Sequence, residues 1–145
     1  MRIMAVDFGD ARTGIAISDM TGTLTGQAWV VNEKNQTKVA KAIAEQSALH
    51  DIGTIVIGYP KNMNGTIGPR AEKSETLVEE IRSLCDVSVV LWDERMTTLN
   101  AHRILTDTGR RGKKRKQTID AVAASLILES YLAYIQTQQG EPNRR

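Results

Sequence analysis

The sequence is poor in the two residues that most often build covalent cross-links and zinc sites. Its single cysteine, Cys85, excludes a disulfide within the chain, which fits a reducing compartment. Cys85 continues a series of mostly apolar residues spaced by three and four, as on one face of a helix, so we interpret it as a small core residue. His50 and His102 are isolated in the sequence, whereas zinc ligands come at paired spacings. We interpret both histidines as surface or packing residues.

Long hydrophobic runs are also missing. No basic segment followed by an apolar one opens the chain, and no apolar run approaches the length of a membrane span. A chain of 145 residues can bury a core, and neither a repeat nor a shift in composition indicates a second domain. We therefore expect a cytoplasmic protein without a membrane partner, with one domain over residues 1–138 and a disordered tail over 139–145.

Basic charge is concentrated in one segment. The chain has 19 Lys and Arg against 17 Asp and Glu, but without the stretch RRGKKRK the acidic residues would outnumber the basic ones. Such a block is typical of a nucleic-acid-binding surface, and a solvated loop without a partner is the simpler alternative. The six residues concerned are Arg110, Arg111, Lys113, Lys114, Arg115 and Lys116.

The order of predicted elements indicates an α/β fold. Three short apolar runs, over residues 2–8, 14–19 and 24–31, follow one another too closely for helical crossovers and predict antiparallel strands. Later strands reached through helices are expected to run parallel to the first, with right-handed crossovers. We predict a five-stranded mixed sheet, its first three strands antiparallel, with helices on both faces. The remaining predicted elements are strands over 54–60 and 87–92, helices over 36–50, 97–108 and 117–138, and a helix with an apolar stripe from 67 to 85.

Three acidic residues are predicted to meet at one edge of this sheet. Asp7 ends the first apolar run, where it is a strand-end cap, half of an ion pair or part of a site, because an unpaired buried carboxylate is costly. Glu94 follows the strand at 87–92, with Asp93 before it, and sites in open α/β sheets form beyond the carboxyl ends of the strands. Asp120 lies on an otherwise apolar face near the start of the last predicted helix. A capping or helix-dipole role is its alternative.

Clustered carboxylates point to a metal site. They repel one another unless cations neutralise them, and oxygen ligands suit Mg²⁺ or Mn²⁺. Two such ions, with substrate bound, would activate a water for attack on a phosphodiester and stabilise the leaving oxygen. We therefore expect Asp7, Glu94 and Asp120 to be both the metal ligands and the catalytic residues.

Basic residues near these acids are candidate phosphate ligands. Gly9 and Gly14 allow a tight turn and a close backbone approach, and Arg12 between them would hold a phosphate or form a surface ion pair. Arg95, directly after Glu94, would clamp a phosphate bidentately. Residues 110–116 are expected to form a mobile loop that orders on nucleic acid.

Four stretches together resemble a known family. DFGDARTGIAISD, GYPKNMNG, DERMTT and IDAVAASLIL are similar, in this order, to the motifs of the YqgF family. These are RuvC-related, RNase H-like proteins described as pre-16S rRNA nucleases or Holliday junction resolvase-like proteins. The resemblance runs from Met1 to about Tyr134 and implies the RNase H-like fold with an acidic site at Asp7, Glu94 and Asp120. It also implies precursor 16S rRNA as the substrate, cleaved in maturation of its 5′ end.

Other classes stay open at this point. DFGDARTG also resembles the first phosphate loop of actin-like ATPases and sugar kinases, although those proteins enclose the nucleotide between two such domains. A Holliday junction resolvase-like DNA endonuclease is a further alternative, because branched DNA and RNA both present phosphate backbones. A non-catalytic nucleic-acid-binding domain with structural acids is the third. The residues do not distinguish a monomer from a homodimer.

Overall fold

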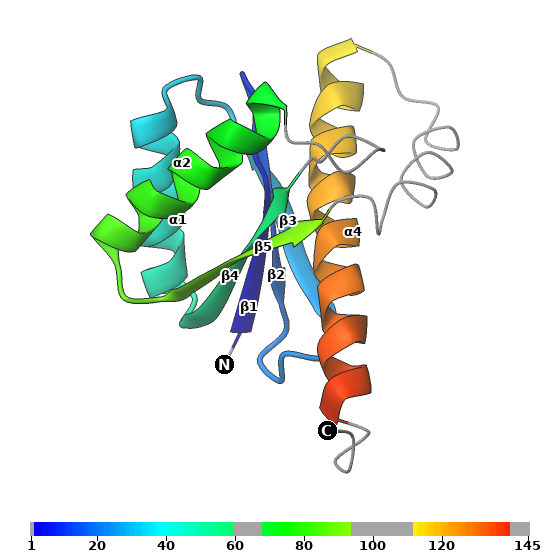
Figure 1. The fold of residues 1–145 in the computed structure, drawn as a ribbon. Helices are drawn as coiled ribbons and strands as arrows, with labels where there is room; N and C mark the ends of the chain where they lie inside the picture. The colour runs from blue at the N-terminus through cyan, green and yellow to red at the C-terminus, as the bar shows by residue number, and fades with distance from the viewer. Residues whose placement is uncertain (1, 60–67, 94–111, 140–145) are drawn as a thin grey trace.

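Five strands form one mixed sheet in the order β3-β2-β1-β4-β5 (Figure 1). The computed structural model describes residues 2–59, 68–93 and 112–139, and of residues 112–118 and 138–139 only the backbone. β1 (Arg2–Asp7) pairs antiparallel with β2 (Thr13–Ser18), and β2 pairs antiparallel with β3 (Thr25–Val31). β4 (Ile52–Tyr59) is parallel to β1, and β5 (Ser88–Asp93) is parallel to β4. The predicted sheet is confirmed, including its antiparallel first three strands.

Two helices cover one face of the sheet (Figure 1). α1 (Gln36–Leu49) begins where the Asn35 side chain accepts a hydrogen bond from the Lys38 amide, which satisfies one of the free donors of the first turn. α2 (Pro69–Leu84) begins with a proline, whose fixed φ suits the first turn of a helix. Between these helices and the sheet lies a core of fully buried aliphatic side chains, among them Met4, Val6, Ile15, Ile17, Ile43, Ile55, Ile57, Leu77 and Ile81.

One long helix covers the other face. α4 (Gly112–Gln139) lies across β1, β2 and β3 (Figure 1). On the sheet side of this contact the small residues Ala5 and Ala16 lie beside Ile3 and Val56, and they pack with Ala124 and Ile127 of the helix. At the β5 edge the Trp92 indole donates to Ser130 Oγ at 3.1 Å. The short side chains let the helix axis come close to the strands.

α4 begins earlier than the sequence indicates. Its first residue is Gly112, five residues before the predicted start at 117, so the expectation of a loop is wrong for residues 112–116. Lys, Arg and Gln are good helix formers. The run of like charges favoured the prediction of a solvated loop, and that prediction did not take their helix propensity into account. The helix ends at Gln139. The predicted helix over 97–108, residues 60–65 of the stretch GYPKNMNG, and residues 140–145 of the predicted tail lie outside the described residues.

α4 also meets the length and composition of a membrane span. The stretch Ile119–Thr137 has 19 residues and a mean hydropathy of 1.2. The expectation that no segment approaches this length is therefore wrong. The helix is nevertheless packed on the sheet through Ala124, Ile127, Leu128 and Leu132, with 28% of the stretch buried, and one such helix is weak evidence for a membrane span.

Candidate active site

Asp7 projects to the side of the sheet that carries α4. Side chains alternate between the two faces along a strand. Ile3 and Ala5 of β1 pack against α4, whereas Met4 and Val6 belong to the core beneath α1 and α2. Asp7, the last residue of β1, continues the row of Ile3 and Ala5. Its partly buried carboxylate thus lies at the carboxyl end of the strand, on the α4 face.

Gly14 brings the helix to this point. It is the residue of β2 that pairs with Asp7. A Cβ atom on Gly14 would lie 2.1 Å from the backbone oxygen of Asp120 and 3.3 Å from Ala124 Cβ. A side chain at Gly14 would therefore push α4 away from the sheet. The expectation of close backbone approach at Gly14 is confirmed, and the approaching segment is the one that bears Asp120.

Asp120 is not a helix-end residue. It lies eight residues after Gly112, in the third turn of α4. Interactions with the helix dipole fall off within the first turn, so neither capping nor the dipole accounts for an aspartate here. The alternative weighed for Asp120 is thereby excluded, and the expected orientation toward the protein is confirmed by its side chain, which is 22% exposed and pairs with Arg12.

Arg12 pairs with Asp120. Its Nε donates to Asp120 Oδ2 at 2.9 Å, and both side chains are largely buried, with 29% and 22% of their surface exposed. Of the two roles considered for Arg12, the free protein therefore shows the ion pair. The turn that presents Arg12 depends on Gly9, where a Cβ atom would lie 2.4 Å from the Arg12 carbonyl oxygen.

The loop between β1 and β2 is also held from the other face. Lys73 Nζ of α2 lies 3.1 Å from Asp10 Oδ1, and Arg70 Nη2 donates to the Phe8 carbonyl oxygen at 3.4 Å. Sequence reasoning missed both contacts, since they join segments more than sixty residues apart and no motif marks them. The loop from Phe8 to Arg12 is thus fixed by α2 on one side and by α4 on the other.

The remaining predicted residues fall in three groups. Asp93 continues the row of Val89 and Leu91 on β5, which faces α1 and α2, so it lies on the opposite face from Asp7. Glu94, Arg95, Arg110 and Arg111 lie outside the described residues. Lys113, Lys114, Arg115 and Lys116 belong to the first turns of α4, without described side chains.

The packing roles expected for Cys85 and for one histidine are confirmed. Cys85 is partly buried against the aliphatic core, and its Sγ lies 3.5 Å from the Ile81 carbonyl oxygen. The His50 ring lies 5.7 Å from that of Trp29 and contacts Gln46. His102 is outside the described residues. The described histidine and cysteine therefore serve packing and not the acidic site.

The acids that are described fit a hard divalent cation. Asp7 and Asp120 supply carboxylate oxygens, the donors that Mg²⁺ and Mn²⁺ prefer, and both lie next to Gly14 on one face of the sheet. Over residues 2–59, 68–93 and 112–139, no three His, Cys, Asp or Glu side chains are grouped closely enough to hold a metal. Two of the three residues expected as ligands are thus described, and Asp93, on the opposite face of the sheet, does not take the place of Glu94.

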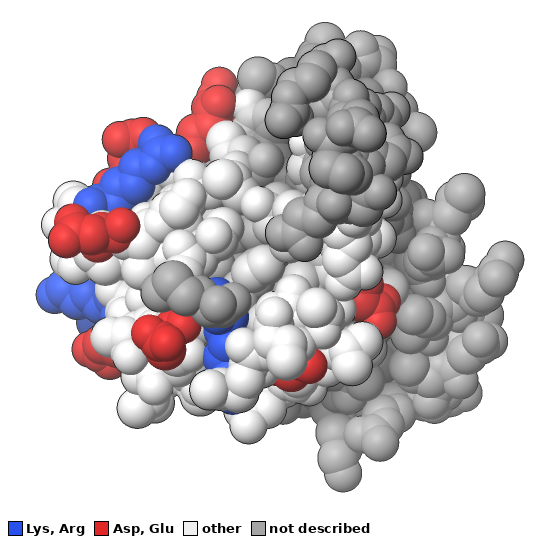
Figure 2. All heavy atoms as spheres, turned by 90° about the horizontal axis from the view of Figure 1, so that it is seen from below, with Lys and Arg blue, Asp and Glu red and all other residues white. Residues whose placement is uncertain are grey.

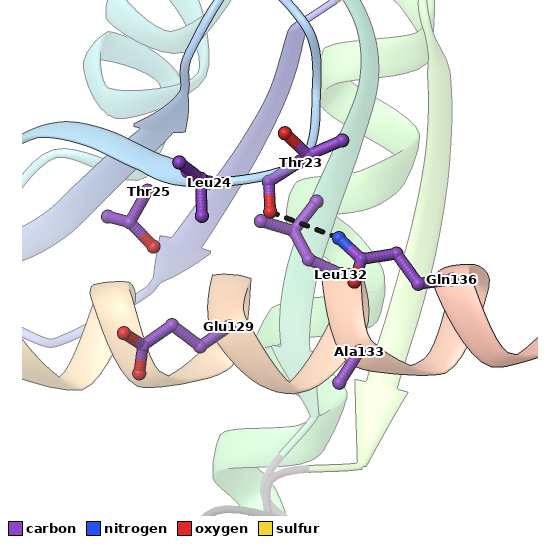
Figure 3. A pocket seen from close by; sticks show the side chains of 7 residues that line it. All are labelled: Thr23, Leu24, Thr25, Glu129, Leu132, Ala133 and Gln136. Carbon is purple, nitrogen blue, oxygen red and sulfur yellow. Dashed lines mark hydrogen bonds between the residues drawn. The ribbon is translucent and has the colours of Figure 1, made fainter.

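The end of the molecule where β1 begins lies opposite the carboxyl end of β1, which carries Asp7. Seen from the end where β1 begins, the described surface has Lys and Arg interspersed with Asp and Glu (Figure 2). A hollow of about 160 Å³ lies there between α4 and the segment leading into β3, where Gln136 Nε2 donates to the Thr23 carbonyl oxygen at 3.1 Å (Figure 3). Ser18, which pairs with Thr25 in this region, accepts from the amide of Ile3 at the start of β1. This hollow is therefore separate from the acids.

The fold is that of the RuvC-like resolvases, an RNase H-like fold. The structure of Thermus thermophilus RuvC in complex with a Holliday junction substrate matches with a TM-score of 0.61 over 94% of this chain and 97% of that chain, at 12% identity. The Fowlpox virus resolvase in complex with Holliday junction DNA matches with a TM-score of 0.58 over 93% and 99%, at 14% identity. At such identities the likeness establishes the fold alone.

Sequence similarity identifies the family. The family RuvX, described as "Holliday junction resolvase", matches residues 1–134, and it is the family also called YqgF. Two relatives are each named "Putative pre-16S rRNA nuclease". The protein from Ruminiclostridium cellulolyticum is 41% identical over 133 residues, covering 91% of this chain and 94% of the relative. That from Halothermothrix orenii is 42% identical over 137 residues, covering 92% and 96%. The chain belongs to the RuvX family, as its four motifs predicted.

Proposed function

We propose that this chain is a metal-dependent nuclease that hydrolyses phosphodiester bonds of precursor 16S rRNA, in maturation of the 5′ end, in the cytoplasm. The observation that carries the proposal is the juxtaposition of Asp7 and Asp120 at Gly14. Both acids lie on one face of the sheet at the carboxyl end of β1, and the chain belongs to a family with relatives named as pre-16S rRNA nucleases.

Three acids would hold the metal. Asp7 and Asp120 offer their carboxylates from β1 and α4, and Glu94, directly after β5, is the third proposed ligand. One or two Mg²⁺ or Mn²⁺ ions bound there supply water activation and stabilise the leaving oxygen of the phosphodiester. The protein's own part is to fix both acids on rigid elements, because the strand pairing at Gly14 and the helix packing above it set their relative positions.

Basic residues would bind the nucleic-acid backbone. The proposed set is Arg12, Arg95, Arg110, Arg111, Lys113, Lys114, Arg115 and Lys116. Lys113, Lys114, Arg115 and Lys116 lie in the first turns of α4, so their positions fall on different faces of the helix. Positions 113 and 116 precede Asp120 by seven and four residues, spacings that fall on one face of a helix, whereas positions 114 and 115 lie roughly 120° or more around the axis. We propose that Lys113 and Lys116, whose positions fall on the same helix face as Asp120, bind the backbone phosphates next to the acids.

Two double variants test this difference between the helix faces with equal loss of charge. Lys113→Ala with Lys116→Ala is expected to weaken RNA binding and flatten its salt dependence by roughly one unit per lost phosphate contact. Lys114→Ala with Arg115→Ala is the matched control and should change both quantities less. RNA affinity measured from 50 to 300 mM salt gives the slopes (roughly the range over which counterion release is resolved). Equal effects of the two pairs would mean that the segment acts through net charge alone.

A DNA endonuclease acting on branched junctions is the second candidate, favoured by the description of the family. Incubation of the protein and Mn²⁺ with labelled precursor RNA, a four-way DNA junction and ATP, in parallel, tests the proposal. Turnover of the RNA supports it, and turnover of the junction alone supports the second candidate. ATP hydrolysis alone, or turnover of none of the three, would contradict both. Asp7→Asn controls for a contaminating nuclease.

A further inference from the structure

The ion pair between Arg12 and Asp120 is unlike the other ion pairs of the described residues. The pairs Lys73–Asp10 and Arg82–Glu79 have side chains that are more than half exposed. Arg12 and Asp120 are 29% and 22% exposed, and their Nε–Oδ2 distance is 2.9 Å. Pairs shielded from water interact more strongly than exposed ones, since solvent and salt screen them less. This pair also joins the β1–β2 loop to α4 beside Gly14, the residue that pairs with Asp7.

The position of the pair explains how the acids coexist without a metal. Asp7 lies on the α4 face, and its pairing partner Gly14 contacts the backbone of Asp120. Two carboxylates held near each other raise the free energy of the folded state unless a positive charge is close. Arg12 supplies that charge from two residues before Gly14, at the end of a loop fixed by Gly9 and by Lys73.

We propose that Arg12 is the resident counterion of this acidic pair and that a divalent cation competes with it for Asp120. The inference rests on the proposed function, because it takes Asp120 as a metal ligand. In the free protein the guanidinium holds one oxygen of the carboxylate. When a cation binds, Arg12 releases Asp120 and its planar fork of donors becomes available to a phosphate, which it suits by geometry.

This competition couples metal binding to substrate binding. A phosphate that draws Arg12 away from Asp120 removes the competitor of the metal, so nucleic acid raises the affinity for the cation. The coupling is reciprocal, and the cation raises the affinity for nucleic acid by the same factor. Arg12 thereby acts as a positioning residue that disfavours a loaded metal site until a backbone phosphate is in place.

Metal binding to the free protein tests the inference. Mn²⁺ titration, followed by the electron paramagnetic resonance signal of the free ion, gives the affinity of each variant without any cleavage assay. Arg12→Gln is expected to bind Mn²⁺ roughly fivefold more tightly than the wild type, the scale of a partly exposed ion pair. Non-cleavable RNA should tighten Mn²⁺ binding to the wild type more than to Arg12→Gln.

Matched variants separate the explanations. Lys73→Gln removes a cation that contacts the same loop through Asp10 and should change the Mn²⁺ affinity by less than about twofold, as expected for an exposed pair. Asp120→Asn should abolish tight binding. Arg12→Lys, which retains the charge, should stay near the wild type, and thermal melts in EDTA show that each variant is folded.

Three results would overturn the inference. Unchanged or weaker Mn²⁺ binding by Arg12→Gln would make Arg12 a structural partner of Asp120. Equal tightening by Arg12→Gln and Lys73→Gln would leave only a general effect of net charge. Absence of Mn²⁺ binding by wild type and variant alike would remove the competition itself. The parallel cleavage assay with RNA and junction DNA stands apart from all three, so it shows whether the proposed function fails as well.

Discussion

The two faces of the sheet are packed by different means. Beneath α1 and α2, large side chains such as Ile43, Leu77 and Ile81 are fully buried and fill the space between the layers. Beneath α4 the strands also present the small residues Ala5, Gly14 and Ala16 beside Ile3 and Val56, and the helix comes close enough for its backbone to touch β2 at Gly14. Burial of large aliphatic groups supplies most of the stability of a fold. Close approach supplies accurate placement, and the two candidate site acids that the structure describes, Asp7 and Asp120, lie on that face.

The difference indicates that the α1–α2 face mainly stabilises the fold and that the α4 face mainly positions the candidate site acids. The interior of a face filled with large side chains disfavours a charged group, because an unpaired buried charge is costly, and Asp93 of this face lies at the strand end. The close approach of α4 at Gly14 places Asp7 and Asp120 at the end of the other face, where both stay partly exposed and Arg12 pairs with Asp120. The comparison can be tested by changing one face at a time and measuring stability and cleavage separately.

Leu77→Ala should give the largest loss of stability. Leu77 of α2 is completely buried in the aliphatic core, and truncation of such a residue costs about 2–5 kcal/mol. Urea unfolding measures the loss, and the cleavage rate per folded molecule should stay unchanged. Leu84→Ala, on the same helix at a residue that is 45% exposed, is the control and should cost less than about 0.5 kcal/mol. A fall in the cleavage rate of folded Leu77→Ala would contradict these separate roles of the two faces.

Asp7→Asn should have the opposite effect. Cleavage is expected to fall by more than about a hundredfold, the scale on which even supporting groups of a metal site act. The free energy of unfolding should stay equal or rise slightly, because the change removes repulsion with Asp120. Single-turnover cleavage and urea unfolding measure the two. Asp93→Asn, at the same sheet edge but on the other face, should reduce cleavage far less. Marked destabilisation by Asp7→Asn would favour a structural role for this acid.

Gly14→Ala should affect both quantities. The added Cβ overlaps the Asp120 carbonyl, so α4 must shift, and overpacking of this kind costs about 1–3 kcal/mol. Cleavage should fall as well, since the shift moves Asp120 relative to Asp7. Gly26→Ala in β3, where the added Cβ would lie 3.2 Å from its nearest neighbour, is a milder control. Wild-type activity in Gly14→Ala would show that the seating of α4 does not position the acids.

The fold was predictable because its signals are local. Apolar runs of strand length and the four-and-three spacing of Ala71, Ser74, Val78 and Ile81 depend on neighbours in the sequence, and all four are buried in α2 as expected. The antiparallel start followed from connections too short for a crossover. The α4 start was not predictable in the same way, because a run of basic residues favours a solvated segment by charge and a helix by propensity.

The site was predictable in its residues and not in its contacts. An acid at a strand end and an acid on an apolar helix face stand out in the sequence, and the structure places Asp7 and Asp120 on the same side of the sheet. Arg12 had two possible roles, and the choice between them depends on a partner 108 residues away. The seating of α4 on Gly14 likewise depends on the packing of the whole layer. Pairings of this kind arise from the fold and leave no local pattern.

The smallest effect is expected at the far end of the sheet, in the turn between β2 and β3. Asp19 Oδ1 accepts hydrogen bonds from Thr21 Oγ1 at 2.7 Å and from the Thr23 amide at 3.2 Å, and these bonds, the Thr21 bond above all, hold the pKa of Asp19 below its ordinary value. A carboxyl whose pKa is lower in the folded than in the unfolded state contributes stability above its unfolded pKa, and loses it as the pH falls through the folded value. The contribution of Asp19 should therefore be complete at neutral pH and fade below about pH 4.

Asp19→Asn and Thr21→Ala should each be slightly less stable than the wild type at pH 7, by a margin that shrinks toward pH 3 in thermal unfolding. Cleavage at neutral pH should not change, because the turn lies away from Asp7 and Asp120. A margin independent of pH would show that the turn is held by its backbone and not by the charge of Asp19, and altered cleavage would extend the functional surface to this end of α4.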